Sequence, residues 1–297
     1  MATKNNRLTR PQAATFNTAA FGGLVTARIQ SGYDNVISSS PDGLDFPVGD
    51  RFAQYVRGNL TGQEWTQIIA LLTGTLGTGV FYGRKAGTAE ATGYVKHTVT
   101  APILHNVGLH LKHRAYASAD AAFECRFPDE DAEIADVWTP TDSQAAPTYI
   151  AAARAAEITA AVHGTTDIYH VMSLDLNIIL QLVKASNDGD KGYTCVDAYL
   201  GGTSPTGQLV IQDMGVTASA FKAETLLANA RGNLVLSIKE QGGTSKTLTI
   251  AGVEFTTCDQ NSDAGQDYDS STLNFVITND ASTPLTLAGT NKLLAVA

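Results

Sequence analysis

The sequence has little charge. Only 16% of its 297 residues are Asp, Glu, Lys or Arg, against roughly 25% in a typical soluble domain. A surface with so few charges is usually covered, and neighbouring subunits are the simplest cover. The net charge of −9 excludes a protein that grips nucleic acid, because affinity for phosphates comes from Lys and Arg. We therefore expect a self-associating protein that does not bind nucleic acid tightly.

Cysteine and long hydrophobic runs are also scarce. Cys125, Cys195 and Cys258 lie far apart, without the C-x-x-C spacing of a zinc or redox site. An odd, sparse count fits a reducing compartment, where buried thiols simply pack. The basic segment 1–10 precedes no apolar stretch, and no run reaches the about 18 apolar residues of a membrane helix. We expect no secretory signal, no membrane insertion, and synthesis in a cytoplasm.

What the sequence does contain is a repeat. Short matches occur in the same order in its two halves, at near-constant spacing. They pair residues 12–14 (QAA) with 144–146 (QAA), Gly32 with Gly164, 60–62 (LTG) with 216–218 (VTA), 96–101 (KHTVTA) with 246–251 (KTLTIA), and Phe123 with Phe275. These matches predict two copies of one unit. The alternative is chance similarity between two β segments that are both rich in Ala and Thr.

Each copy is expected to contain one amphipathic helix. In the first copy, Thr61 and Glu64 form a T-x-x-E capping box, which indicates a helix N-terminus. Four apolar residues follow at the i, i+3, i+4, i+7 spacing of a buried helix face. They are Trp65, Ile68, Ile69 and Leu72. The second helix is expected near residues 218–230. Its matching core residues are Phe221, opposite Trp65, and Leu227, opposite Leu71.

The other elements are expected to be strands. Apolar and polar residues alternate within 23–30, 98–125, 234–239 and 247–256, as they do in half-buried strands. Strands with one packed helix per copy predict an α+β, mostly β fold made of two tandem β-sandwich or barrel units. The expected divisions are an N-terminal arm 1–11, a first unit 12–127, a linker 128–143, a second unit 144–279 and a C-terminal arm 280–297.

The order of parts resembles the tail tube (major tail) proteins of long-tailed bacteriophages. The shared features are a polar N-terminal arm, a strand ending at 55–59 (YVRGN), the capped helix, a long Gly-rich loop at 83–93, and alternating strands within 98–125. In that family one domain contributes strands to a barrel around a central channel, and six domains form each ring. With two fused tube domains per chain, the resemblance implies a trimeric ring with pseudo-sixfold symmetry, stacked into a tube.

The resemblance also implies partners and a location. Double-stranded DNA would pass through the tube only as cargo, from capsid to host. Other tail proteins, such as the tape measure and the terminator, would be the protein partners. The chain would be assembled in the host bacterial cytoplasm and would end in the tail of the virion. No cofactor and no catalytic turnover are implied.

Acidic residues on strands are candidates for the channel wall. Carboxylates in a lumen repel phosphates and keep a passing duplex from sticking. Because strand residues alternate between faces, acids set between apolar positions are the ones to consider. The candidate lumen-facing acids are Asp120, Glu124 and Glu254.

Other chemistry finds weak support in the sequence. His105, His110 and His113 lie close together, but His110 differs in parity from the other two, which disfavours one metal site on a strand face. The acidic stretch 259–269 (DQNSDAGQDYD) is similar to a calcium loop, yet it lacks the Glu at position twelve of an EF-hand. No G-x-S-x-G or P-loop motif occurs. Another virion part, such as a terminator, distal tail or decoration protein, and a carbohydrate-binding β-sandwich adhesin are the alternative functions.

Overall fold

The computed structural model describes the following residues: 9–16, 19–21, 23–38, 48–63, 65–66, 77–85, 92–129, 132–147, 155–185, 197–213, 223–261, 269–278 and 294–296. Within them the chain is mostly β, which confirms the expected α+β, mostly β class. The strands form one 13-stranded and one 5-stranded sheet. No helix in this part of the chain is long and apolar enough to cross a membrane.

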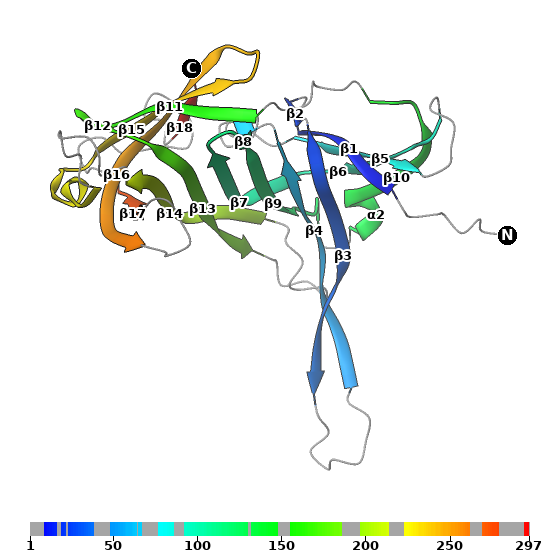
Figure 1. Ribbon diagram of the computed structural model, residues 1–297. Helices are drawn as coiled ribbons and strands as arrows, with labels where there is room; N and C mark the ends of the chain where they lie inside the picture. Colours follow the sequence, from blue (N-terminus) through cyan, green and yellow to red (C-terminus); the bar gives the residue numbers. More distant parts are fainter. Residues whose placement is uncertain are drawn as a thin grey trace.

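The first half of the chain contributes strands to both sheets (Figure 1). Its strands and short helix are β1 (Thr9–Phe16), β2 (Ala19–Phe21), β3 (Leu24–Ser38), β4 (Val48–Gly62), β5 (Gly79–Lys85), β6 (Tyr94–Val99), β7 (Pro102–Lys112), β8 (Ala115–Tyr116), β9 (Ser118–Cys125), α2 (Ile134–Val137) and β10 (Trp138–Gln144). β3 and β4 continue beyond the body of the large sheet as a two-stranded ribbon, which Figure 1 shows pointing away from the molecule.

All the described strands of the second half belong to the large sheet. Its elements are β11 (Ala155–His163), β12 (Thr166–Ile168), β13 (Val171–Ala185), β14 (Asp197–Asp213), the 3-10 helix η1 (Ala223–Ala228), β15 (Gly232–Glu240), β16 (Ser245–Asn261), β17 (Asp269–Ile277) and β18 (Leu294–Val296). The predicted strands at 234–239 and 247–256 are confirmed as parts of β15 and β16.

Strands pair in the same order in the two halves. β1 pairs with β2 and β5, as β11 pairs with β12 and β15. β4 pairs with β3 and β9, as β14 pairs with β13 and β17. β9 pairs with β7, as β17 pairs with the second part of β16. β16 of the second half therefore corresponds to β6 followed by β7.

The register irregularities recur as well. An extra residue that opposes none on the partner strand marks a β-bulge, and bulges are local, specific features of a sheet. Eight of them form four pairs at corresponding sites of the two halves. They lie at Pro11/Ala13 and Ile158/Ala160, Leu24/Thr26 and Val171/Ser173, Asp34/Asn35 and Gln181/Leu182, and Leu104/Asn106 and Phe255/Thr257. Two unrelated β segments are not expected to share four bulge positions.

This correspondence corrects several sequence matches. Ala14 of β1 lies opposite Phe21 of β2, as Ala161 of β11 lies opposite Ile168 of β12. The offset between these corresponding residues is 161 − 14 = 147 instead of 132. The matches of 12–14 with 144–146 and of Gly32 with Gly164 are therefore wrong. Phe123 with Phe275 is a correct match, because each pairs with a glycine of the neighbouring strand, Gly58 or Gly207.

Three expected divisions also differ from the observed strands. The segment predicted as a linker contains α2 and most of β10, and β10 pairs with β6 in the small sheet. The predicted C-terminal arm contains β18, which pairs with residues 248–250 of β16 at the site corresponding to β6. The arm predicted at 1–11 already includes the start of β1. Polar composition concealed β10, which lies at the edge of the small sheet and is mostly exposed.

The predicted helices need correction in part. Thr61 lies in β4, where it pairs with Thr26 and Asp120. Because β4 continues to Gly62, Thr61 is not the helix cap. Trp65 is buried, at 2% exposure, as expected of a core residue. In η1, Leu227 is exposed and its neighbour Leu226 is buried instead. The remaining helix positions lie outside the described residues: Glu64, Ile68, Ile69, Leu72 and Phe221.

The core of the first half lies between its two sheets. Phe16 of β1 and Phe81 of β5 pack against Phe123 of β9, and the ring centroids are 5.4–5.9 Å apart. All three rings are buried. In the second half Phe275 replaces Phe123, and His163 stands at the position of Phe16. The buried Nε2 of His163 lies 3.0 Å from the Val253 carbonyl.

A glycine lies under each corresponding phenylalanine. A Cβ on Gly207 would overlap the ring of Phe275, which supplies all three of the nearest atoms. We expect Gly207→Ala to lower the free energy of unfolding by about 1–3 kcal/mol, the usual cost of overpacking a core. In a Phe275→Ala background the same change should cost almost nothing. Urea unfolding of the four chains measures this coupling; additive costs would contradict it.

Candidate functional site

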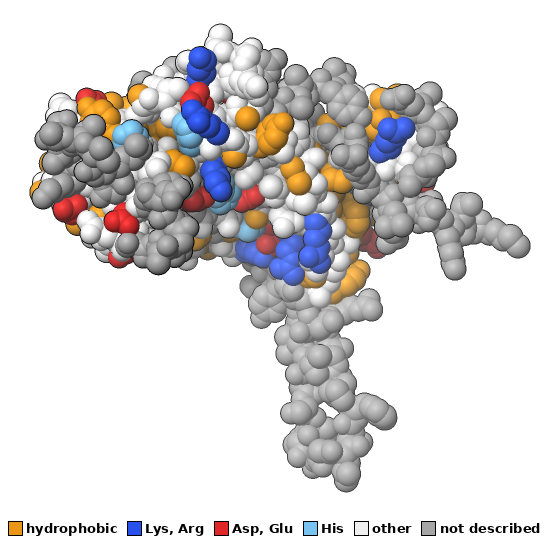
Figure 2. Space-filling model, in the orientation of Figure 1, with side chains coloured by type: hydrophobic (Ala, Val, Ile, Leu, Met, Phe, Trp, Pro, Cys, Tyr) orange, Lys and Arg blue, Asp and Glu red, His pale blue; other side chains and the backbone are white. Residues whose placement is uncertain are grey.

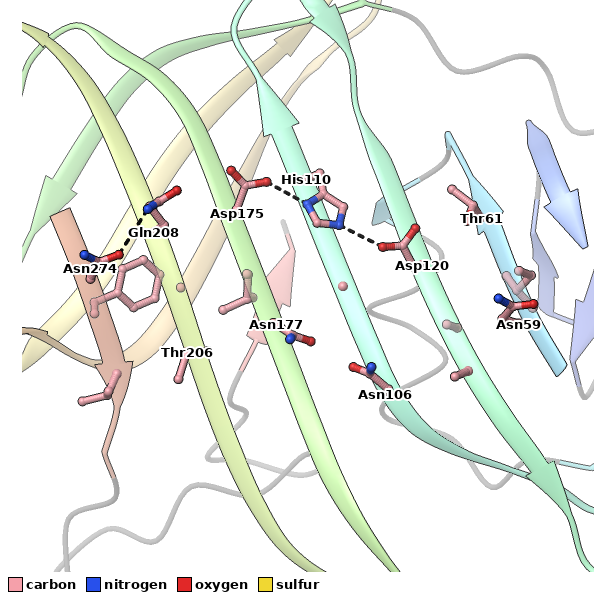
Figure 3. A pocket seen from close by; sticks show the side chains of 18 of the residues that line it. Asn59, Thr61, Asn106, His110, Asp120, Asp175, Asn177, Thr206, Gln208 and Asn274 are labelled. Atoms are coloured by element: carbon pink, nitrogen blue, oxygen red, sulfur yellow. Dashed lines mark hydrogen bonds and ion pairs between the residues drawn. The ribbon is translucent and has the colours of Figure 1, made fainter. Parts of the chain in front are cut away.

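One face of the large sheet carries mostly polar side chains over its middle. Along β7 and β13 the residues alternate, with Leu109 and Leu176 buried on one side and polar residues on the other. We call that other side the polar face. Figure 3 shows its side chains coming from β4, β7, β9, β13, β14 and β17, across both halves of the chain. They include Asn59, Thr61, Asn106, His110, Asp120, Asp175, Asn177, Thr206, Gln208 and Asn274, and they line a hollow of about 750 Å³.

The two halves meet on this face at the pairing of β7 with β13. His110 of β7 lies between two carboxylates: its Nδ1 is 2.7 Å from Asp175 Oδ1 on β13, and its Nε2 is 2.8 Å from Asp120 Oδ2 on β9. The three side chains are each a little under half exposed. A second ion pair, between Lys184 of β13 and the buried Glu124 of β9, also links the two halves of the chain. These contacts tie the second half to the first.

The carboxylates shift the titration of His110. Burial by itself would lower the pKa, but the hydrogen bonds and charges of Asp175 and Asp120 outweigh it and raise the pKa above the ordinary 6.5. A raised folded pKa means that the stabilisation is fully present below pH 6.5 and is lost as the pH rises through the raised value. Because His110 and its two carboxylates are partly exposed to solvent, this stabilisation of the folded state is about 1 kcal/mol at most.

The His110 cluster gives a pH-dependence prediction. Between about pH 6 and about pH 8 the wild-type protein should lose stability that the His110→Gln variant does not lose. His97 and His105 have lowered pKa values, chiefly because of burial, and titrate in the opposite sense, but they are present in both proteins and cancel in the comparison. Chemical unfolding at the two pH values is the measurement. Identical pH slopes in the two proteins would contradict the assignment.

The candidate lumen acids lie in three different settings. Asp120 lines the hollow. Glu124 is only 7% exposed and is paired with Lys184, so it offers little free charge to a channel. Glu254 is exposed on β16. It lies opposite Val276 of β17, and Val276 lines the hollow. Sequence reasoning missed Asp175, although its place between Leu174 and Leu176 has the same alternating signal as the acids it selected.

Basic residues also reach the polar face. The exposed Arg28 of β3 and Arg57 of β4 border a smaller hollow of about 210 Å³, together with His105. The Arg57 guanidinium lies 4.0 Å from the centre of the Tyr55 ring. In Figure 2, Lys and Arg side chains gather near the base of the β3–β4 ribbon, while acidic side chains lie over the β16–β17 region. The polar face therefore carries opposite charges at its two ends.

The histidines do not gather at one point. His105 lies by Glu124 and Lys184, whereas His113 Nε2 is 3.9 Å from Glu157 on β11. Among the residues that the structure describes, no three His, Cys, Asp or Glu side chains are placed to hold a metal ion. In the stretch that is similar to a calcium loop, Asp259 accepts a hydrogen bond from the Asn274 amide at 3.3 Å, and residues 262–268 lie outside the described part of the chain.

Two long strand edges that flank the polar face have no partner strand within the described residues, in addition to short edge strands such as β12 and β18. β3 ends the strand order and pairs only with β4. Residues 254–261 of β16 pair with β17 on one side and with no described strand on the other. These edges correspond to the edges of β13 and β7 that pair with each other inside the chain. No protein-family model matches the chain, and no curated protein matches it either.

Proposed function

We propose that this chain is a structural virion protein that forms stacked rings of a phage tail tube, with the polar face lining the channel for DNA. The observation that carries the proposal is a pair of open strand edges, β3 and residues 254–261 of β16, that flank the polar face. Unpaired strand edges promote association, and a closed ring of sheets pairs every edge. Each open edge matches an edge that is already paired between the two halves, so joining head to tail repeats an existing contact.

The doubled pairing pattern supports a trimeric ring. Three chains supply six similar sheet segments, joined alternately within and between chains, which gives pseudo-sixfold symmetry. The channel wall would then present the amides, hydroxyls and charges of the polar face to water. Water-covered polar groups let a duplex pass without fixed contacts, and the net charge of −9 opposes lasting adhesion of phosphates. The function would come from shape and charge, without catalysis.

In this proposal DNA is transient cargo, and the lasting partners are further copies of the chain. Other tail proteins, such as the tape measure and the terminator, would meet the inside and the end of the tube. The protein would reach the virion tail after assembly in a bacterial cytoplasm. A ring that never stacks would instead favour the terminator or distal tail alternative, because a tube subunit occurs in many rings per particle.

Electron microscopy of the purified protein tests the proposal. We expect rings with six lobes, or hollow tubes built from them, that appear as the protein concentration rises. Sedimentation velocity over the same range should show a trimer or larger species. A protein that stays monomeric at every concentration, with no rings on the grid, would refute the proposal.

A further inference from the structure

The contact between the two halves has a defined register. β7 and β13 pair antiparallel, with His110 opposite Asp175, Gly108 opposite Asn177 and Asn106 opposite Ile179. The close approach of His110 and Asp175, 2.7 Å between nitrogen and oxygen, marks them as neighbours on one face of the sheet. Directly opposite residues are the closest side-chain pairs in an antiparallel sheet. The pairing of β7 with β13 therefore provides a template for the corresponding open edges, β3 and residues 254–261 of β16.

The open strands can be numbered from the same template. Val171 pairs with Ile211 as Leu24 pairs with Gly62, so β3 lies 171 − 24 = 147 residues before β13. Phe255 pairs with Phe275 as Leu104 pairs with Phe123, so β16 lies 255 − 104 = 151 residues after β7. The counterparts of Asp175 and His110 are then Arg28 and Asn261.

We infer that β3 of one chain pairs antiparallel with residues 257–261 of β16 in a second copy, in one register. The opposed positions are Arg28 with Asn261, Gln30 with Asp259, and Gly32 with Thr257. This joint rests on the proposed ring and adds to it the strands, the direction and the register. The occupant of both edges is another copy of this chain.

Charge complementarity supports the head-to-tail direction. On the polar face, Arg28 lies diagonally across the joint from Asp259, two residues from its opposed position, which is within reach of a long side chain. Both side chains are exposed in the single chain. A joint of β3 with β3 would bring Arg28 near its own copy, and β16 with β16 would do the same for Asp259. Like charges across a strand pair are destabilising, so both symmetric joints are disfavoured.

The apolar side of the joint differs from its internal template. Inside the chain, Ile178 opposes Val107 and Leu176 opposes Leu109, and all four are buried. The corresponding pairs between chains are Ser31 with Cys258, and Ile29 with Gln260. Less apolar area is therefore buried between chains than within one. The two halves stay joined while whole chains remain free to assemble and separate.

Disulfide trapping tests the register. In a Cys258→Ser background, Gln30→Cys is made in one chain and Asp259→Cys in another, and the two are mixed and oxidised. We expect covalent dimers from the mixture and none from either chain alone, with the linked peptides identified by mass spectrometry. Pairing Gln30→Cys with Asn261→Cys should give about ten times less product, because diagonal positions lie about 7–8 Å apart, beyond the usual disulfide range.

The outcomes separate this joint from the proposed function. Dimers linked between positions 30 and 259 support the register. Rings visible by electron microscopy without that link, or with the off-register pair linked better, would overturn the register and leave the ring standing. Dimers from Gln30→Cys alone would overturn the head-to-tail direction. Neither rings nor links, from chains whose unfolding curves match the wild type, would overturn both.

Discussion

Arg28→Glu is expected to prevent ring formation, and adding Asp259→Arg to the same chain is expected to restore it. The single change places two negative side chains across every joint between chains. An exposed ion pair contributes about 1 kcal/mol. A ring of three chains has three joints, so the loss is about 3 kcal/mol, or roughly a hundredfold in the association constant for the ring. The double change re-forms the pair with its charges exchanged.

Sedimentation velocity and electron microscopy over a range of concentrations measure this effect. Arg84→Glu is the matched control, because it makes the same charge change on an exposed residue of β5, away from the joint. Higher salt should narrow the difference between wild type and Arg28→Glu, since the charges are exposed to solvent. Rings formed equally well by Arg28→Glu and the control, or no rescue by the double change, would contradict the joint.

Phe123→Ala is expected to lower the free energy of unfolding by about 3–5 kcal/mol, the usual cost of removing a buried aromatic ring. Phe123 is fully buried, stacks on Phe81 at 5.5 Å, and covers Gly58. The position beneath the ring is a glycine, which has no side chain to fill the space. The cavity therefore remains open.

Urea unfolding of Phe123→Ala against Ile179→Ala provides the comparison. Ile179 is 48% exposed, so its truncation should cost little. Phe275→Ala should resemble Phe123→Ala, because Phe275 covers Gly207 in the same way. If Phe123→Ala were within about 0.5 kcal/mol of the Ile179 control, the aromatic cluster would not hold the two sheets of the first half together.

Sequence alternation predicted the strands that have one buried and one polar face. β7 is an example, since Leu109 and Leu111 point to the core and His110 points to the polar face. The match of Phe123 with Phe275 also came from the sequence. The matches of 12–14 with 144–146 and of Gly32 with Gly164 failed because bulges and loops differ in length between the two halves. The offset between corresponding residues therefore changes, from 147 in β1 to 152 at Phe275. Local patterns do not reveal where such extra residues are inserted.

Short or edge elements escaped sequence reasoning for other reasons. β10 contains Pro140, and five of its seven residues are exposed, so its composition is typical of a linker; only its pairing with β6 makes it a strand. Thr61 has the sequence of a cap, but the ladder to Asp120 extends β4 past it. In η1 the tighter 3-10 turn shifts the buried position to Leu226.

The candidate site was the least predictable part. Alternation placed Asp120 on the polar face, but it did not show that Lys184 covers Glu124. His110 and Asp175 are 65 residues apart and meet only because β7 pairs with β13. Such a long-range pairing has no local signal. The open edges likewise can be identified only when the pairing partners of every strand in both halves are known.

A three-dimensional reconstruction of the assembled protein by cryo-electron microscopy tests the central claim most directly. The claim predicts three chains per ring, with β3 of each chain paired to β16 of the next and with Asp120 and Asn177 on the inner wall. An assembly in which the polar face points outward, or in which β3 contacts no β16 strand, would contradict it.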